Sequence, residues 1–186
     1  MDTGWNLNLG TGSWTISFWC ADFNTGSDLS YIFGESTTSF RCFTGGVAGV
    51  NNWILRGDGI NDVLLTGAAT ITPHVVHFVY DAAAGNIKAY MDGVLHNTVA
   101  QAPLNLNGAN SFIVGGYSAA NAMNGKIDEF RMYNRALDAT EIAATWNQDL
   151  APMAVPLSAW AIIPALFLLG VIAFIRFRRK VLRPVI

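Results

Sequence analysis

Carboxylates are the residues with which this chain could perform chemistry on a sugar, and their spacing argues against it. A glycosidase needs two carboxyl groups that flank one glycosidic bond. The chain has three glutamates, Glu35, Glu129 and Glu141, and none belongs to a cluster of carboxylates along one strand. Asp128 and Glu129 are neighbours, so on a regular strand they point to opposite faces. The pattern predicts a protein that is not an enzyme.

Histidines and aspartates form no metal-binding motif. His74 and His77 stand three residues apart, and on a strand such residues face opposite ways, so they cannot chelate one ion together. Asp58, Asn61 and Asp62 lack the spacing of a calcium-binding loop. We interpret all five as ordinary residues of sheets and loops.

Aromatic rings are the remaining candidates for ligand binding. Trp19, Phe43 and Trp53 lie in or beside strand-like segments, where an exposed ring could stack on a sugar. Most aromatic residues of a sandwich lie in its core, so core packing is the first interpretation. The tripeptide Arg56-Gly57-Asp58 spells an adhesion motif, but the surrounding glycines indicate a loop, and matches this short arise by chance.

Two cysteines, Cys20 and Cys42, leave two alternatives open. Outside the cytoplasm such a pair can form a disulfide. Both residues also lie in apolar, alternating segments, where a thiol serves as a small buried hydrophobe. Spacing along the chain does not give the distance between the Cα atoms, so it does not decide between the two.

The first three quarters of the chain have the pattern of β structure. Trp14, Ile16, Phe18 and Cys20 alternate with more polar residues, as in a half-buried strand. Asp92-Gly93 between two later apolar runs predicts a type I′ hairpin turn. Many short strands and no early helix predict an all-β fold, an antiparallel jelly-roll β-sandwich. The predicted strands cover residues 14–20, 29–33, 40–43, 53–56, 63–65, 75–80, 87–91, 94–99, 111–114 and 126–133.

One short helix is predicted to close the domain. Asp138 is a good N-cap, and Glu141 follows at the third helical position, which is the spacing of a capping box. Leu137 and Ile142 can form the accompanying hydrophobic staple. The helix is expected over residues 139–147.

The C-terminal segment has the composition of a membrane-spanning helix. Residues 159–175 contain no charged or strongly polar side chain. A bilayer core accepts only internally hydrogen-bonded backbone, and cations stay on its cytoplasmic side. We expect residues 149–156 to form a Pro-containing linker and residues 157–186 a single transmembrane helix with a basic cytoplasmic tail, whose topology signal is Arg176, Arg178, Arg179 and Lys180.

This orientation would leave the sandwich domain, residues 1–148, outside the cytoplasm. No signal peptide is visible after Met1, because the first residues include neither a basic nor an apolar region. We expect the true N-terminus to lie further upstream. The alternative is a tail anchor, which would leave the domain in the cytoplasm.

Charge disfavours one class of partner. The first 150 residues carry six basic and thirteen acidic side chains, whereas the tail carries five basic ones. An acidic domain without a stripe of Lys and Arg is a poor nucleic-acid binder, because it cannot displace counterions from phosphates. Nucleic acid is therefore not an expected partner.

Three segments resemble laminin-G-like jelly-roll domains of the concanavalin A-like lectin/glucanase superfamily. Residues 124–142, NGKIDEFRMYNRALDATEI, are similar to the closing signature of these domains. Residues 74–98 resemble their central pair of strands, and residues 14–19, WTISFW, an early strand. The resemblance covers about residues 12–146 and implies a lectin-like sandwich. The opening strand of the family has no clear copy here, which agrees with a truncated N-terminus.

The resemblance also implies a metal candidate. Related jelly rolls place an aspartate of the closing strand at a structural Ca²⁺, and Asp128 fits that position. Calcium takes about six to eight oxygen ligands, and the sequence does not identify the others. The alternative is that Asp128 caps backbone or pairs with Arg131.

The tail resembles bacterial C-terminal sorting signals of the PEP-CTERM and IPTL-CTERM kind. The similarity lies in an apolar helix, an arginine cluster and the preceding residues Val155, Pro156, Leu157, Ser158 and Trp160. Such signals are thought to be cut by exosortase-type membrane proteases, which the resemblance implies as a partner. A plain membrane anchor is the alternative.

These features predict a non-catalytic cell-surface or secreted binding module, with a carbohydrate or a surface glycoprotein as its ligand and adhesion as its role. Its expected location is the bacterial inner membrane with the domain outside the cytoplasm, or the cell surface or the medium after C-terminal processing. The alternative function is a passive structural module of a larger surface protein. A glycoside hydrolase is the least favoured class.

Overall fold

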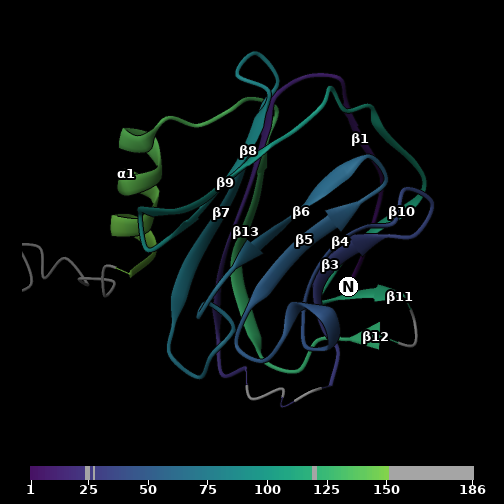
Figure 1. Ribbon diagram of the computed structural model, residues 1–186. Coiled ribbons are helices and arrows are strands. Elements are labelled where there is room, and N and C mark those ends of the chain that lie inside the picture. The colour runs from purple at the N-terminus through teal and green to yellow at the C-terminus, as the bar shows by residue number, and fades with distance from the viewer. Residues whose placement is uncertain (24–25, 27, 119–120, 151–186) are drawn as a thin grey trace, which may run out of the picture. The chain divides into compact units, whose positions relative to one another are not determined.

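The computed structural model describes residues 1–23, 26, 28–118 and 121–150, which belong to one compact unit. Two antiparallel sheets pack face to face, and a short helix lies on one of them (Figure 1). This arrangement confirms the predicted all-β sandwich with its closing helix. Within those ranges, no helix has the length and apolarity that a membrane crossing requires. The predicted linker, sorting motif and transmembrane segment lie beyond them, apart from the first linker residues.

The two sheets differ in size. The larger sheet has six strands, in the order β1 (Asp2–Gly10), β10 (Leu106–Val114), β3 (Ser30–Glu35), β4 (Phe40–Thr44), β5 (Trp53–Gly57) and β6 (Ile60–Leu65). The smaller sheet has five, in the order β13 (Lys126–Tyr133), β2 (Trp14–Ala21), β7 (His74–Asp81), β8 (Asn86–Met91) and β9 (Val94–Ala100). The remaining elements are a 3₁₀ turn η1 (Gly46–Ala48), a two-stranded ribbon of β11 (Gly116–Ser118) and β12 (Asn121–Ala122), and α1 (Ala139–Leu150).

The main core lies between the two sheets and follows the predicted alternation. Trp14, Ile16, Phe18 and Cys20 all point into it from β2. The prediction that this strand is half-buried is wrong, however, because residues on its other face are buried as well. Cover on both faces makes β2 a central strand, with β13 and β7 as its neighbours.

Strands β1, β11 and β12 were not expected from the sequence, and β1 is the longest of them. Its residues, DTGWNLNLG, are mostly polar and exposed, and Leu7 alone is fully buried. The strand is also held by backbone pairing with β10. Hydrophobic periodicity did offer a signal for this strand, because Trp5, Leu7 and Leu9 alternate with Asn6 and Asn8.

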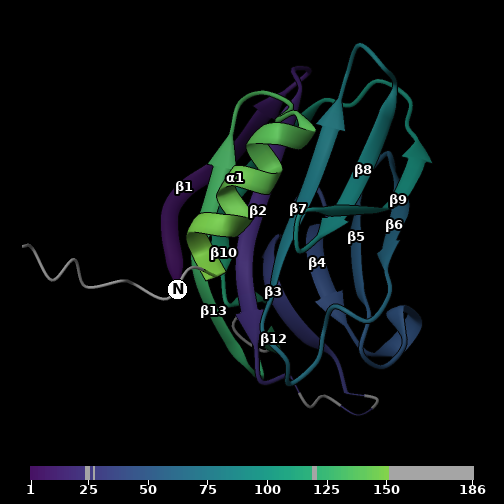
Figure 2. The same ribbon diagram turned by 90° about the vertical axis from the view of Figure 1, so that its left-hand side faces the viewer.

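Helix α1 covers the outer face of the five-stranded sheet (Figure 2). Its N-terminus confirms the capping box: Asp138 Oδ1 accepts from the backbone N of Glu141 at 2.9 Å, and Glu141 Oε2 accepts from Asp138 N at 3.0 Å. Ile142 is fully buried, in one cluster with Leu137 and with Val79 of β7. The staple pair thus anchors the helix on the sheet.

Side-chain amides bridge the two sheets at the edge formed by β6 and β9. Asn61 Nδ2 donates to Ala100 O at 2.7 Å, and Asn97 Nδ2 donates to Leu64 O at 2.8 Å. Just after β9, Gln101 Nε2 donates to a carbonyl of the β5–β6 turn at 2.7 Å. The edge strands of the two sheets are therefore joined by directed hydrogen bonds.

The predicted type I′ turn joins β8 to β9. Asp92 and Gly93 have φ angles of 54° and 78°, the left-handed values that this turn requires. The Asp92 carboxylate also reaches the start of β7, where Oδ1 accepts from Val75 N at 2.9 Å and Oδ2 lies 2.8 Å from His74 Nδ1. His74 therefore takes part in a structural turn.

Candidate functional site

The three glutamates lie on different elements and are each engaged locally. Glu129 on β13 pairs with Arg131 at 2.5 Å, and Glu141 on α1 binds Arg135 at 2.7 Å. The pKa of Glu141 falls to about 2, mainly because of the hydrogen bonds from Arg135. These two carboxylates stabilise neighbouring charges of the fold.

Glu35 is fully buried at the end of β3 and organises the turn to β4. Its carboxylate accepts from the backbone N of Thr37 and of Thr38, each at 2.8 Å, and from both of their hydroxyls. Asn110 N of β10 also donates to it, at 3.2 Å. Burial by itself would raise the pKa of Glu35, but the hydrogen bonds from Thr37 and Thr38 outweigh it and lower the pKa to about 2. Glu35 is a structural carboxylate.

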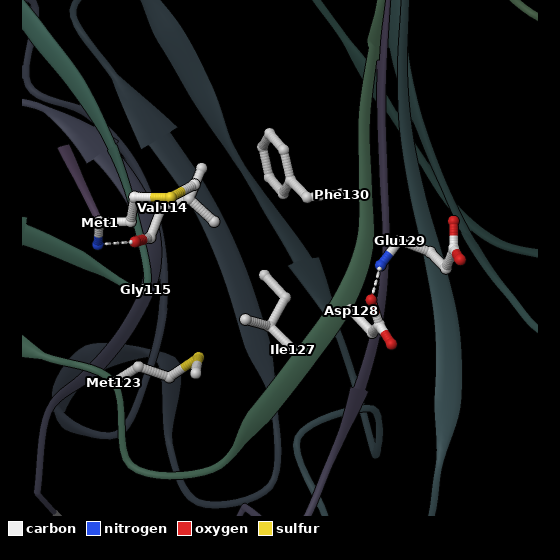
Figure 3. A pocket seen from close by; sticks show the side chains of 8 residues that line it. All are labelled: Met1, Val114, Gly115, Met123, Ile127, Asp128, Glu129 and Phe130. Carbon is white, nitrogen blue, oxygen red and sulfur yellow. Dashed lines mark hydrogen bonds between the residues drawn. The ribbon is translucent and has the colours of Figure 1, made fainter. Parts of the chain in front are cut away.

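A bulge in β13 changes where Asp128 and Glu129 point. Asp128 pairs with Trp19 of β2, but the next paired residue is Arg131, and Glu129 has a φ of 51°. Such an extra residue moves the following side chains to the other side of the strand. The prediction that Asp128 and Glu129 face opposite ways is therefore wrong. Figure 3 shows both on one side of β13, with Phe130 on the other.

A hollow of about 480 Å³ lies beside this bulge. Figure 3 shows the apolar side chains of Met123, Ile127 and Phe130 on its side of β13, whereas the carboxylates of Asp128 and Glu129 are directed away. Its wall is completed by Met1, Val114 and Gly115. The hollow offers an apolar surface, and the bulge removes the nearby charges from it.

Asp128 has a local role in the structure. Its Oδ1 accepts from Glu129 N at 2.8 Å, which is the backbone-capping alternative foreseen from the sequence. Among residues 1–23, 26, 28–118 and 121–150, no group of three or more His, Cys, Asp or Glu is placed to hold a metal ion. A calcium site at Asp128 stays a prediction that needs oxygen ligands of other kinds.

Both cysteines are buried free thiols. Cys20 lies on β2 and Cys42 on β4, and Cys20 Sγ donates to Ala68 O at 3.6 Å. Burial raises the pKa of Cys20 to about 12 and that of Cys42 well above its usual range. The structure corresponds to the buried-hydrophobe alternative and contains no bond between the two.

The three aromatic candidates lie in different environments. Trp53 is fully buried, and its Nε1 donates to Ala68 O at 3.1 Å, so the core interpretation holds for it. Trp19 is half-buried on the outward side of β2. Phe43 is buried outside the main core, in a separate cluster with Tyr31 and Ile54.

The adhesion-like tripeptide belongs to a tight hairpin. Arg56 and Gly57 end β5, and the exposed Asp58 begins the two-residue turn into β6. Arg56 Nε donates to Asp62 Oδ1 at 2.7 Å, and a second hydrogen bond joins the same side chains. The arginine is held against its own hairpin.

The most distinctive surface feature is a stack of aromatic rings and guanidinium groups on the outer face of the six-stranded sheet. Phe40 and Cys42 of β4 point into the core, so Arg41 and Phe43 between and after them point outward. We call the outward group the arginine–aromatic stack; its members are Tyr31, Arg41, Phe43, Arg56 and Tyr117.

Each ring or guanidinium group of the stack lies against at least one other member of the stack. Tyr31 lies 5.4 Å from Tyr117, with ring planes only 18° apart, and 5.4 Å from Phe43. The Arg41 Cζ lies 5.3 Å from the Tyr117 ring centre and 5.5 Å from that of Phe43. Arg56 Cζ lies 5.8 Å from the centre of the same Phe43 ring. Each guanidinium is attracted by the electron-rich face of a ring.

A glycine creates the space for Tyr117. Gly34 of β3 is the cross-strand partner of Arg41, and a Cβ atom at Gly34 would lie 2.3 Å from Tyr117 Cδ2. The Tyr117 ring therefore lies directly over Gly34, next to Arg41. Sequence reasoning singled out Phe43 of this group as a candidate ring and Arg56 only as part of the adhesion-like tripeptide. The available signal was the polar-to-apolar alternation of β4, with Arg41 placed between two core residues.

The two packed antiparallel sheets define a β-sandwich domain. Residues 3–143 match the laminin G-like family described as the concanavalin A-like lectin/glucanases superfamily. The chain therefore belongs to this superfamily, as the three resembling segments predicted. No curated protein sequence matches the chain.

Solved structures with this fold include bacterial toxin binding domains. The binding domain of botulinum neurotoxin DC, solved in complex with rat synaptotagmin II, is 16% identical with a TM-score of 0.57, over 74% of this chain and 36% of that one. A botulinum neurotoxin type C structure, whose cell entry depends on two ganglioside molecules, is 15% identical with a TM-score of 0.57 over the same shares.

A third similar structure is the binding domain of Paraclostridial Mosquitocidal Protein 1, which is 14% identical with a TM-score of 0.58. It is matched over 80% of this chain and 40% of its own length. This chain therefore spans well under half of the solved proteins that it resembles. At these identities the likeness is one of fold.

Proposed function

We propose that this domain is a non-catalytic module that binds carbohydrate or a surface glycoprotein through the arginine–aromatic stack. The observation that carries the proposal is the stack itself: the half-buried Tyr117 ring and two half-buried guanidinium groups lie over the buried rings of Tyr31 and Phe43 on the outer face of the six-stranded sheet. The accessible part of the Tyr117 ring can pack on the apolar face of a sugar, and guanidinium N–H groups can donate to sugar oxygens.

Two further observations support binding over catalysis. Glu35 is buried within its turn, and Glu129 and Glu141 are each paired with an arginine, so these carboxylates serve the fold. The solved relatives in fold are named as binding domains of larger toxins. A hydrolase would need a carboxylate pair placed on either side of a bound sugar.

A glycan array probed with the full chain in detergent, with and without Ca²⁺, tests the proposal. Binding to a defined set of glycans is expected, and Tyr117→Ala, which removes a half-buried ring of the stack, should abolish it. The matched control is Trp5→Ala, which removes a 40% exposed ring from edge strand β1. Uniform silence of the wild type would favour a passive structural module, and hydrolysis of a glycan would favour an enzyme.

The same array tests calcium. We keep Asp128 as the candidate ligand, because it lies at the bulge of the closing strand with its carboxylate directed outward. If Ca²⁺ supports binding, Asp128→Asn should remove the calcium dependence and leave the unfolding transition near its wild-type position in the absence of the ion.

The C-terminal residues complete the proposal for location. Residues 157–186 are proposed as a membrane anchor or as an exosortase-processed sorting segment, which places the domain outside a bacterial cell. Mass spectrometry of the mature protein distinguishes the two, because processing yields a product that ends near Ser158, whereas plain anchoring retains Ile186. Protease added to spheroplasts should remove the domain, and protection would refute the orientation.

A further inference from the structure

We propose that the arginine–aromatic stack recognises an acidic sugar, one that carries a carboxylate, through the guanidinium group of Arg41. This inference rests on the proposed function and specifies the ligand class of the same site. It starts from a difference between Arg41 and the other arginines of the described residues. The others are each paired with a carboxylate: Arg56 with Asp62, Arg131 with Glu129 and Arg135 with Glu141.

Arg41 has no carboxylate partner within the described part of the chain. Its NH1 donates to the backbone carbonyl of Ser39 at 2.6 Å, and its Cζ lies over the rings of Tyr117 and Phe43. A half-buried guanidinium carries five N–H donors, and one carbonyl uses only part of that capacity. The remaining donors lie in the plane of the guanidinium group and can serve a ligand.

This geometry suits a carboxylate better than a neutral hydroxyl. A guanidinium group forms two parallel hydrogen bonds with a carboxylate, and such charge-assisted pairs are stronger than neutral hydrogen bonds. Contacts with the Tyr117 and Phe43 rings and the hydrogen bond to Ser39 O also restrict the Arg41 side chain before a ligand arrives. Less rotational entropy is then lost on binding.

The hydrogen bonds of the buried Glu35 hold the turn that binds Arg41. Glu35 holds the amides and hydroxyls of Thr37 and Thr38, and Thr37 Oγ1 accepts in turn from Ala109 N at 2.8 Å. The next residue, Ser39, has a φ of 51° and provides the carbonyl that receives Arg41. Glu35 is thus a positioning residue, which acts on the ligand only through the turn.

The charge of the surface limits the ligand to few negative charges. Asp62 neutralises Arg56, so the stack presents the net positive charge of Arg41 alone. The domain around it is acidic, with thirteen acidic and six basic side chains in the first 150 residues. A densely charged polyanion would be repelled by this field, whereas one carboxylate on a mostly neutral glycan matches the site. Uronic acids and sialic acids share this chemistry.

Matched pairs of oligosaccharides test the proposal on the full chain in detergent, by isothermal titration or biolayer interferometry. One pair is a galacturonic acid oligosaccharide and its methyl ester, and the other is sialyllactose and lactose. We expect the acid of at least one pair to bind at least tenfold more tightly than its neutral partner. The pair that shows the preference identifies which acidic sugar is the source of the carboxylate.

Substitutions then locate the preference. Arg41→Lys keeps the charge but loses the fork, and it should reduce the acid preference by about tenfold to a hundredfold. Gly34→Ala leaves every charge in place and displaces the Tyr117 ring, and it should reduce the preference in the same direction. Lys88→Ala, which removes a cation from β8 of the other sheet, is the control and should change nothing.

Circular dichroism and thermal melts accompany each variant, so that loss of fold is recognised. Equal binding of acid and neutral partners by the wild type overturns the proposal while leaving glycan binding intact. An acid preference that survives Arg41→Lys in folded protein also overturns it. Absence of binding to every glycan overturns the proposed function and this inference with it.

Discussion

The outer faces of the two sheets are both shielded from water, but by different means. On the five-stranded sheet, α1 covers the face with an apolar contact in which Ile142 packs with Val79 and Tyr90. On the six-stranded sheet, side chains of the sheet cover one another by stacking, as Arg41 does over Phe43. An apolar cover stabilises the fold and leaves few hydrogen-bonding groups. Stacked planar groups shield the sheet and keep their polar edges available for recognition.

The largest expected effect tests the helix-covered face. Ile142→Ala should destabilise the domain by about 2–5 kcal/mol, because it removes a fully buried side chain and leaves a cavity between α1 and the sheet. Urea unfolding followed by circular dichroism measures the change. Glycan binding at low urea should be retained, since the stack lies on the other sheet.

The exposed Leu95 gives a control for that experiment. Its side chain is 49% exposed on β9, so Leu95→Ala should change stability by no more than about 0.5 kcal/mol. A cost below about 1 kcal/mol for Ile142→Ala would mean that the helix does not stabilise this face.

The next effect tests the support of the stack. Glu35→Gln should cost about 2–4 kcal/mol at neutral pH, because a buried carboxylate that accepts several hydrogen bonds loses its charge. The folded-state pKa of Glu35 is about 2, below its ordinary value of 4.5. Its stabilising contribution is therefore fully present above about pH 4.5 and is lost as the pH falls toward 2.

Thermal melts of both proteins at several pH values check this. The difference between wild type and Glu35→Gln should narrow steadily below pH 4.5. The variant should also lose part of the acid preference, because the turn that holds Arg41 loosens. A difference that does not depend on pH would contradict the assignment of Glu35 as an ionised, buried carboxylate.

A smaller effect concerns the start of the helix. Asp138→Ala should cost about 0.5–2 kcal/mol, because the backbone N–H groups of Thr140 and Glu141 lose their acceptor. Asp138→Asn should recover most of the loss, since asparagine is an equally good N-cap. Chemical unfolding of the two variants side by side provides the measurement, and failure of Asn to exceed Ala would count against the cap.

The smallest expected change in stability concerns the ion pair between Asp62 and Arg56 at the arginine–aromatic stack. Asp62→Asn breaks a partly exposed ion pair with Arg56 and should alter stability by less than about 1 kcal/mol. Arg56 would then add a second unpaired cation to the stack. Titration with an acidic oligosaccharide should show binding about two- to fivefold tighter than in the wild type. Weaker binding would indicate that Asp62 itself contacts the ligand.

The elements whose residues contact the core were predictable from the sequence. The alternation of β2, the turn at Asp92-Gly93 and the capping box at Asp138 are local patterns, and each is present where it was expected. β1 was missed although it is held both by backbone pairing with β10 and by side chains, since Leu7 lies in the core and Trp5 contacts Phe112. The signal that was passed over is the alternation of Trp5, Leu7 and Leu9 with two asparagines.

The candidate site was predictable only in fragments. Phe43 stood out as an aromatic residue, but Tyr31 and Tyr117 are brought to it from distant positions by sheet register. The orientation of Glu129 depends on a bulge that moves its side chain to the other face. The residue with positive φ at this bulge is Glu129 itself, so no glycine marks the bulge in the sequence. Long-range register and local irregularity therefore account for the residues that sequence reasoning did not find.

The amide bridges between β6 and β9 affect how neighbouring copies of this domain meet. A strand at the edge of a sheet normally offers unpaired carbonyls to any other chain, and this is how fibrils begin to grow. Here the carbonyls of Leu64 and Ala100 already accept from Asn97 and Asn61. These two carbonyls at the β6–β9 edge are therefore already hydrogen-bonded when another copy of the domain approaches. The same amides that join the two sheets thus keep these two carbonyls from pairing with a strand of another copy.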